Sequence, residues 1–170
     1  MNNLKKIIIS GSFVALTIVI VSCNPSSSNS NNIQDGSTSA TENILVFERG
    51  EEVNSPNFTG GKVWLNNLVD ADSINQNAVG SVTFEAGART KWHSHPAGQI
   101  ILAIDGEGYY QEDGKEKIVV KKGEVMKCPK DVPHWHGASA QSHFVQVAIT
   151  GRENGETVWL KEVTDEDYNK

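Results

Sequence analysis

Short apolar segments separated by turn residues dominate the chain from Val79 onward. Each segment is rich in β-branched and aromatic residues, and Gly, Asp or Pro recurs roughly every ten residues, a pattern typical of an all-β sandwich or barrel. The predicted strands are Gly80–Phe84, Gly98–Ile104, Glu107–Gln111, Lys117–Val120, Val125–Cys128 and Phe144–Ile149. The predicted turns between them are Glu85–Gly87, Asp105–Gly106, Asp113–Gly114 and Lys121–Gly123.

Helices have little place in this pattern. After the first forty residues no segment carries a long helical period, and only a short helical turn is predicted, near Thr164–Tyr168. Ahead of the barrel, Ile44–Phe47 and Lys62–Leu65 can supply edge strands, and Ser55–Gly61 between them has the residues of a loop. We find no internal repeat, so the sequence predicts a single all-β domain.

The first residues have the pattern of a targeting segment. Lys5 and Lys6 precede an apolar run, Ile7–Val21, which ends in a stretch that resembles the bacterial lipobox and places Cys23 as its acylated cysteine. The alternative is an uncleaved membrane anchor, but the run is shorter than the roughly 20 apolar residues that a spanning helix needs. We therefore predict a lipoprotein signal peptide over residues 1–22.

Residues 23–41 are mostly Ser, Asn and Thr, and this composition predicts a flexible linker. The remaining residues, 42–170, would form the folded domain. The expected location is the bacterial cell envelope, on the periplasmic or outer face, with lipid on Cys23 as the only membrane contact.

The length and net charge of the chain limit the number of domains and the kinds of partner. A chain of 170 residues suffices for one domain, and its formal net charge of -6 gives no basic field for nucleic acid. The two cysteines imply no disulfide framework. Cys128 follows Lys127, a cation that can activate a thiol, but the simpler interpretation is a small, semi-buried strand residue.

The five histidines fall within about fifty positions, and four of them form two His-x-His pairs, namely His93 with His95 and His134 with His136. Residues two apart on a strand point to the same face, so His93 and His95 can converge inside a barrel. Gln99 begins the next predicted strand and can bring a carbonyl oxygen to the same point.

The spacing of these residues resembles the cupin family. From Gly87 the chain reads G-x5-H-x-H-x3-Q-x6-G, like the first cupin motif with Gln99 in the place of a common glutamate. From Gly123 it reads G-x5-P-x4-H, like the second motif, with His134 as the histidine. Asp131 stands where this motif prefers glycine, and Ala138 stands where it often has asparagine. The resemblance implies a cupin double-stranded β-helix, or jelly-roll barrel, while histidines in a barrel without metal are the alternative.

The expected metal ligands are His93, His95, Gln99 and His134. Three neutral imidazoles and an amide leave the charge of a divalent cation uncompensated, which makes it a strong Lewis acid. Nitrogen and oxygen donors without a thiolate favour Mn(II), with Fe(II), Zn(II) and Ni(II) as alternatives. Four protein ligands on an octahedral ion leave two positions for substrate, as in a catalytic site.

Three further histidine and glutamine positions are open to more than one interpretation. His136 can face the metal cavity or lie in a solvated loop, and His143 can simply border the last strand. Gln146 lies within the apolar run Phe144–Ile149, where a buried amide needs a partner that the cavity can offer.

Residues 81–99, 133–138 and 163–168 closely resemble small single-domain bacterial cupins, among them the manganese-dependent cupin hydroxynitrile lyases. The resemblance places Val82, Thr90 and His136 around the metal. It also places Gln146 where those lyases have a proton-moving histidine, and a glutamine is no general base near neutral pH. His136, Gln146 and Thr90 are thus the candidate catalytic residues, and a homodimer is expected by the same resemblance.

Three functions remain on this basis. The leading hypothesis is a metal-dependent enzyme that acts on a small oxygen-bearing molecule, with lyase chemistry on hydroxynitrile or carbonyl substrates as its most concrete form. The alternatives are an Fe or Mn dioxygenase of the quercetinase type and a small-molecule-binding cupin without turnover.

Overall fold

A computed structural model describes residues 46–170, which form twelve strands and one short helix. The strands are β1 (Glu51–Glu52), β2 (Phe58–Thr59), β3 (Val63–Val69), β4 (Asn77–Phe84), β5 (Arg89–Thr90), β6 (His93–Ser94), β7 (Gln99–Glu112), β8 (Ile118–Lys121), β9 (Val125–Cys128), β10 (His134–Ala138), β11 (Phe144–Gly151) and β12 (Val158–Trp159). The helix is α1 (Asp165–Asn169). The predicted signal peptide, linker and Ile44 lie outside the described residues.

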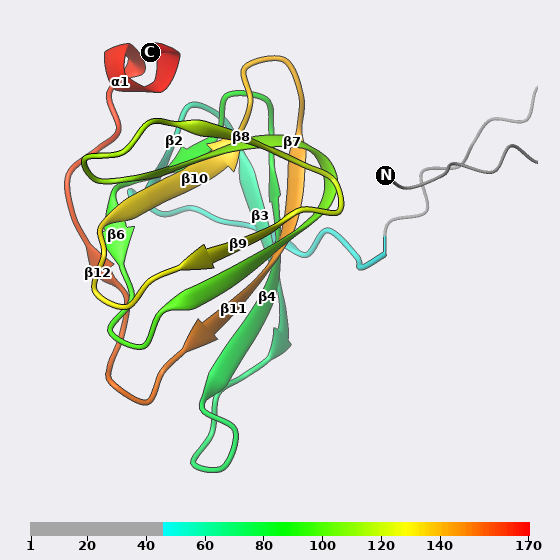
Figure 1. The fold of residues 1–170 in the computed structure, drawn as a ribbon. Coiled ribbons are helices and arrows are strands. Elements are labelled where there is room, and N and C mark those ends of the chain that lie inside the picture. Colours follow the sequence, from blue (N-terminus) through cyan, green and yellow to red (C-terminus); the bar gives the residue numbers. More distant parts are fainter. Residues whose placement is uncertain (1–45) are drawn as a thin grey trace, which may run out of the picture. The chain divides into compact units, whose positions relative to one another are not determined.

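The strands pair antiparallel into a curled sheet with the order β1-β3-β4-β11-β7-β10-β5-β2, to which β6, β8, β9 and β12 attach at the sides (Figure 1). The predicted all-β jelly roll is therefore confirmed. Val46 and Phe47 are not in a strand, whereas Lys62–Leu65 falls largely within β3. Phe58 and Thr59, predicted as loop, form the short strand β2 because they pair with β5.

One predicted turn is wrong. Asp105 and Gly106 do not reverse the chain, because β7 continues through them from Gln99 to Glu112. Gly106 has φ 74°, and a Cβ atom there would lie 2.0 Å from the carbonyl oxygen of His143. The glycine thus lets one strand bend between two halves of the barrel: its first half pairs with β11 and β9, and its second half with β10 and β8.

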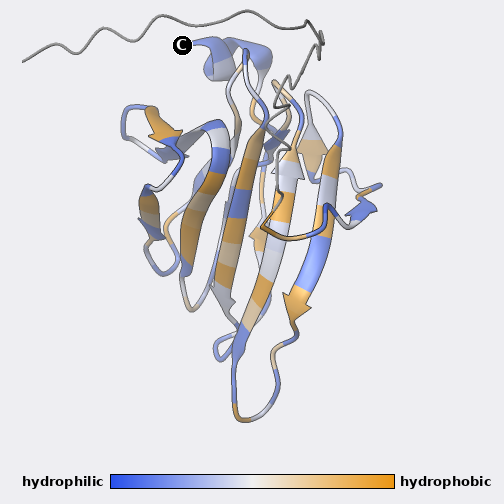
Figure 2. Cartoon of the chain, turned by 90° about the vertical axis from the view of Figure 1, so that its right-hand side faces the viewer, coloured by the Kyte–Doolittle hydropathy of each residue, from blue (hydrophilic) through white to orange (hydrophobic). Residues whose placement is uncertain are grey.

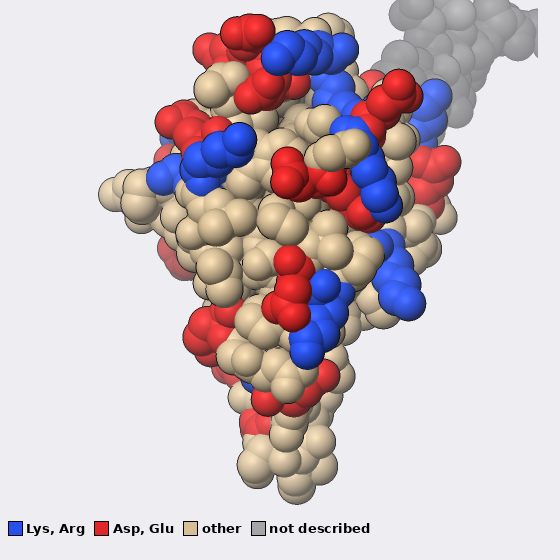
Figure 3. Space-filling model, turned by 60° about the vertical axis from the view of Figure 1, so that its left-hand side comes forward, with Lys and Arg blue, Asp and Glu red and all other residues tan. Residues whose placement is uncertain are grey.

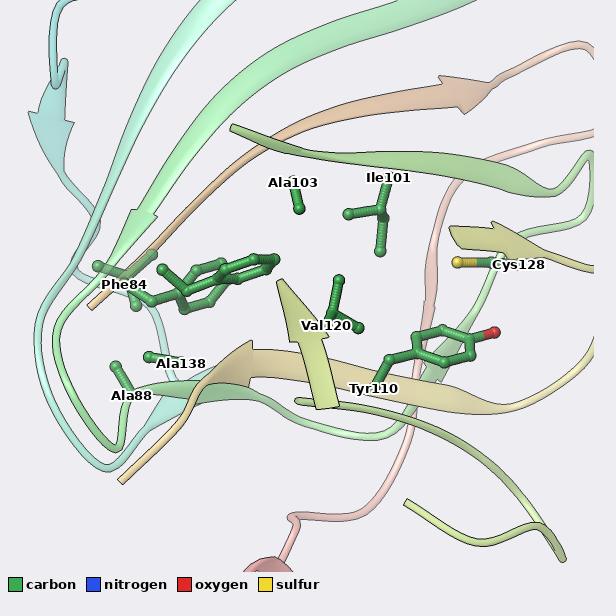
Figure 4. Packing of buried hydrophobic residues seen from close by; sticks show 10 residues of the cluster. Phe84, Ala88, Ile101, Ala103, Tyr110, Val120, Cys128 and Ala138 are labelled. Atoms are coloured by element: carbon green, nitrogen blue, oxygen red, sulfur yellow. The ribbon is translucent and has the colours of Figure 1, made fainter. Parts of the chain in front are cut away.

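The strands alternate between an inner and an outer face, visible as alternating bands of hydropathy (Figure 2). Phe84, Ile101, Ala103 and Phe144 point inward and are at most 4% exposed. All four belong to one core cluster, in which Figure 4 labels Phe84, Ile101 and Ala103. On the outer face, Val69, Val79, Ile149 and Ile100 lie side by side across β3, β4, β11 and β7.

The C-terminal arm, residues 152–170, returns across the barrel and is fastened to it by Arg89. This buried guanidinium donates to the carbonyl oxygen of Val163 at 3.0 and 3.2 Å and to Asp165 at 2.6 Å. It also lies 4.5 Å from the ring centre of Tyr168, whose hydroxyl donates to Ala138. The arm carries β12 onto β6 and so onto the predicted metal ligands.

α1, as predicted near Thr164, begins after that residue, whose hydroxyl accepts from the backbone of Asp167. No helix among residues 46–170 is long and apolar enough to cross a membrane. Side chains of both charge signs are interspersed on the face shown in Figure 3, with wide uncharged surface between them.

Asp131, one of the two departures from the second cupin motif, adopts a backbone conformation that favours glycine. It is the one non-glycine residue of the described chain with a positive φ, 60°, at the position where the second motif prefers glycine. We expect Asp131→Gly to stabilise the fold by about 0.5–1 kcal/mol, because relief of left-handed strain exceeds the entropy that glycine adds to the unfolded chain. The ion pair with Lys130 that would be lost spans 3.9 Å between two exposed groups and contributes little. A lower urea midpoint for Asp131→Gly would contradict this.

Candidate metal centre

Three histidines from two separate stretches of chain meet inside the barrel. His93 on β6 is the register partner of His134 on β10, and their ring centroids are 4.4 Å apart. His95 follows directly after β6, 5.0 Å from His93 and 5.4 Å from His134 between ring centroids. One nitrogen from each ring lies within 4.8 Å of the other two, and all three side chains are buried. The predicted convergence of His93, His95 and His134 is therefore present.

Hydrogen bonds hold each imidazole by its Nδ1 atom. Nδ1–H of His93 donates to the carbonyl oxygen of Lys91, and Nδ1–H of His134 donates to that of Val132, both at 2.9 Å. Since a carbonyl can only accept, the proton of each neutral ring is on Nδ1 and the lone pair is on Nε2. Both rings are thus held in the tautomer that binds a metal through Nε2.

The Nε2 atoms of His95 and His134 are buried and have no hydrogen-bond partner among residues 46–170. Burial and, to a lesser extent, the proximity of His134 lower the pKa of His93 well below its usual value and that of His95 to about 3. The rings are therefore neutral near pH 7. Neutral nitrogen lone pairs that converge without a donor cost free energy, and a cation at that point would offset the cost.

Gln99, the first residue of β7, joins this group. Its Nε2 donates to the Thr150 hydroxyl at 2.9 Å, and its carbonyl oxygen, Oε1, accepts a weak contact from the Cys128 thiol at 3.8 Å, which leaves a second lone pair of that oxygen available. The Gln99 side chain also lies beside His95, where it raises the pKa of that ring against the larger, opposite effect of burial. An amide anchored by its nitrogen can present its oxygen to a metal, so the donor set of three imidazoles and one amide fits a divalent cation.

Known proteins resemble this chain over most of the described residues. The family model "Cupin domain" matches residues 80–149. An (R)-mandelonitrile lyase from Granulicella tundricola is 39% identical over 114 residues, which are 66% of this chain and 86% of that protein. The chain belongs to the cupin family. A cupin-like protein from Thermotoga maritima is 44% identical, with a TM-score of 0.71 over 74% of this chain and 95% of that chain.

A more distant structure supports the cupin fold alone. A predicted oxalate decarboxylase from Thermotoga maritima has 18% identity and a TM-score of 0.52, and the match covers 65% of this cupin and 91% of that chain. The predicted resemblance to the group of cupins that contains hydroxynitrile lyases is confirmed by the identity with (R)-mandelonitrile lyase.

His136 faces the interior of this cupin. Its side chain is 5% exposed, its ring centroid lies 5.2 Å from that of His93, and its Nδ1 has no hydrogen-bond partner within residues 46–170. Burial lowers its pKa well below the usual value. The interpretation as a solvated loop residue is therefore wrong. Thr90 lies beside it, and the Thr90 hydroxyl accepts from the backbone N–H of His136 at 3.2 Å, so Thr90 holds this part of β10 in place.

Gln146 is fully buried on β11, next to His136. Neither its Nε2 nor its Oε1 has a hydrogen-bond partner within the described part of the cupin. The sequence indicated a buried amide that needs a partner, and the structure shows the amide in the barrel interior without a hydrogen bond of standard geometry, although it lies close enough to His136 to oppose the lowering of that ring's pKa by burial. Such a group is a candidate for contact with a bound ligand.

Two residues stay outside the centre. His143 is half exposed and pairs with Asp105 at 3.1 Å, in agreement with a place at the border of β11. Cys128 is 1% exposed, and burial raises the pKa of its thiol to about 12, so the interpretation as a reactive cysteine is wrong. The interpretation as a strand residue is confirmed, although Cys128 is fully buried rather than semi-buried; its sulfur lies 3.8 Å from Oε1 of Gln99.

Sequence reasoning missed Thr157, which belongs to the C-terminal arm. Its hydroxyl oxygen lies 3.2 Å from Nδ1 of His95 and accepts from Arg152 at 3.3 Å. Arg152 in turn pairs with Glu156 at 2.7 Å. No motif marks a threonine so far from the histidines in sequence, yet it holds His95 as Lys91 and Val132 hold the other two rings.

Thr157→Val should weaken metal binding about 10- to 100-fold, because the His95 ring loses the group that orients it. Competition with a fluorescent chelator measures this affinity. Thr157→Ser keeps the hydroxyl and should retain most of it. If Thr157→Val binds metal as tightly as the wild-type cupin, the hydroxyl does not position His95.

Proposed function

We propose that this cupin binds one divalent metal ion through His93, His95, Gln99 and His134, and that it is a lyase acting on a small oxygen-bearing molecule of the hydroxynitrile or carbonyl class. The observation that carries the metal proposal is the set of buried histidine nitrogens within 4.8 Å of one another, two of them without a partner among the described residues. The lyase proposal is supported by the relative named (R)-mandelonitrile lyase.

Manganese is the metal we propose, with Fe(II), Zn(II) and Ni(II) as alternatives. The donors are imidazole nitrogens and one amide oxygen, and the Cys128 thiol stays protonated because burial raises its pKa. A set without thiolate and with an oxygen donor favours the harder divalent ions.

The chemistry divides between the ion and the protein. A bound divalent cation would supply Lewis acidity that favours loss of the proton from a substrate hydroxyl. In cyanohydrin cleavage that proton leaves the oxygen, the carbon–carbon bond to the nitrile breaks, and its electron pair departs on cyanide, which takes up a proton. His136 offers Nδ1 beside the centre to hold or move that proton, and Gln146 offers amide contacts to the substrate.

The test combines metal analysis with an assay. Protein as isolated should contain close to one equivalent of metal, and the metal-restored protein should release benzaldehyde from (R)-mandelonitrile, followed by its ultraviolet absorbance. Loss of activity with a chelator and its return with Mn(II) would support the proposal. Absence of metal binding after addition of each candidate ion would contradict it.

Gln146 favours a second candidate function. An amide cannot take up a proton near neutral pH, and Gln146 stands where the resembling lyases have a histidine. A cupin that binds a small molecule without turnover accounts for this substitution. Metal-loaded protein whose melting temperature rises with a ligand, but which turns over no cyanohydrin or carbonyl compound, would establish this function instead.

We also propose that the mature protein is held in the bacterial cell envelope by lipid on Cys23, with residues 23–41 as linker and residues 42–170 as the cupin domain. The apolar run before Cys23 supports this. The full-length protein should sediment with membranes, and Cys23→Ser should release it from the lipid-anchored fraction.

A homodimer is proposed as well. Its support is the outer row of Val69, Val79, Ile149 and Ile100, in which Val69 is 42% and Ile100 is 41% exposed. A patch of this kind fits a second copy of the same sheet face, because a two-fold axis places the row on itself. Light scattering should give twice the chain mass, and Ile100→Lys should give the mass of one chain.

A further inference from the structure

Five aromatic rings beside the histidine centre form a closed circuit in which each ring contacts the next. Ring centroids are 6.0 Å apart for Trp159–Phe58, 6.2 Å for Phe58–Phe84, 6.0 Å for Phe84–His136, 5.2 Å for His136–His93 and 4.9 Å for His93–Trp159. Such separations lie in the range at which aromatic rings attract one another. Two members of the circuit, His93 and His136, belong to the candidate metal centre and its surroundings.

The circuit extends from the interior to the solvent. Phe84, His93 and His136 are at most 5% exposed, whereas Trp159 is 38% exposed. Trp159 on β12 is the register partner of His93 on β6, and the two rings are in contact. The indole therefore lies between His93 of the histidine centre and solvent.

The chemistry of the circuit selects a neutral partner. Phe58, Phe84 and Trp159 carry no charge, so these three rings offer no ion-pair partner to a ligand. A cation would be attracted to aromatic faces, but it would be repelled by a divalent ion held at the neighbouring histidines. A flat, uncharged group satisfies both conditions, and an aryl ring gains edge and face contacts that an aliphatic ring of similar size does not.

We propose that Trp159 and Phe58 form a subsite for the aryl substituent of a molecule whose oxygen is held at the histidine centre. The inference rests on the proposed function and deepens it, because it names the part of the substrate that these residues recognise. Both residues come from short strands: β12 pairs with β6, and β2 pairs with β5. The subsite is therefore built from segments that the two cupin motifs do not contain.

Binding of two alcohols to metal-loaded protein tests the subsite without any need for turnover. The probes are benzyl alcohol and cyclohexylmethanol, measured by calorimetry. The wild-type protein should bind benzyl alcohol about three- to tenfold more tightly. Trp159→Leu and Phe58→Leu should each lose most of that preference while their metal content stays unchanged, and Trp159→Phe should keep part of it. Trp64→Leu is the matched control, because Trp64 lies elsewhere, under Arg49 at 4.6 Å, and should bind as the wild type does.

The outcomes separate this inference from the proposed function. If Trp159→Leu weakens both alcohols equally or neither, or if the wild-type protein binds neither, the aryl subsite is refuted. A second outcome also refutes the subsite: Trp159→Leu loses metal, while Phe58→Leu keeps both its metal and the preference for benzyl alcohol. In that case Trp159 only covers His93. An intact aryl preference in a protein that cleaves no cyanohydrin would leave the subsite standing and overturn the lyase proposal.

Discussion

His134→Ala should yield a folded protein that retains no divalent metal through purification, with an affinity for Mn(II) at least about 100-fold below that of the wild type. His134 is fully buried, its Nδ1 is fixed by Val132, and its Nε2 is one of the partnerless atoms that face the common centre. Removal of the imidazole takes away a ligand that no other side chain among residues 46–170 replaces at that point. Elemental analysis measures the content, and activity should fall with it.

The matched control is His143→Ala. This histidine is half exposed and pairs with Asp105 rather than with the centre, so the variant should keep its metal and its activity. Thermal unfolding adds a second measurement: a chelator should lower the melting temperature of the wild type and of His143→Ala, and should leave that of His134→Ala unchanged. A His134→Ala protein with a full equivalent of tightly bound metal would show that the ion sits elsewhere.

Gln146→His should raise the rate of cyanohydrin cleavage by about 100- to 10,000-fold, the usual contribution of a positioned general base. The position is fully buried on β11, beside His136, and its amide atoms have no partner in residues 46–170. An imidazole there can take up the hydroxyl proton, which an amide cannot. Because the base acts in its neutral form, the rate should rise with pH through the pKa of the introduced imidazole and then level off.

Gln146→Leu separates the proton-transfer role from a simple change of shape. It removes the two partnerless polar atoms at similar volume, so stability should stay the same or rise, and the rate should not increase. Equal rates for Gln146→His and the wild-type cupin would show that proton transfer at this position does not limit the reaction. A higher rate for Gln146→Leu would show that the amide itself obstructs the substrate.

The fold was predictable because local and long-range signals agree. Turn residues, alternating apolar positions and the two His-x-His pairs all indicate a barrel with histidines inside, and the centre formed by His93, His95 and His134 confirms it. Gln99 could be placed because it opens a strand directly after this pair. Boundaries were predictable only where a turn really reverses the chain: Asp105 and Gly106 have the composition of a turn, but pairing with β11 and β10 on either side keeps β7 continuous.

The sequence did not indicate the part of the site that comes from segments outside the two histidine motifs. Phe58 and Trp159 lie in strands of two residues each, and Thr157 directly precedes β12, so these segments are too short for any period to be visible. Their positions follow from pairing with β5 and β6 and from the contacts of Arg89, which are decided by tertiary packing. Gln146 was visible as a polar residue in an apolar strand, but its missing partners could be seen only in three dimensions.

The C-terminal arm also has an evolutionary consequence. The proposed metal ligands are all carried by the barrel, whereas Thr157 and Trp159 are carried by the C-terminal arm, which Arg89 of β5 holds against the barrel. Under the proposed function, a change at Trp159 can therefore alter substrate choice while the proposed metal ligands stay in place, whereas a change at Thr157 would also weaken metal binding. A chimaera that joins this barrel to the tail of another cupin would then inherit its chemistry from one parent and its selectivity from the other, provided that the new tail supplies a hydroxyl in the place of Thr157.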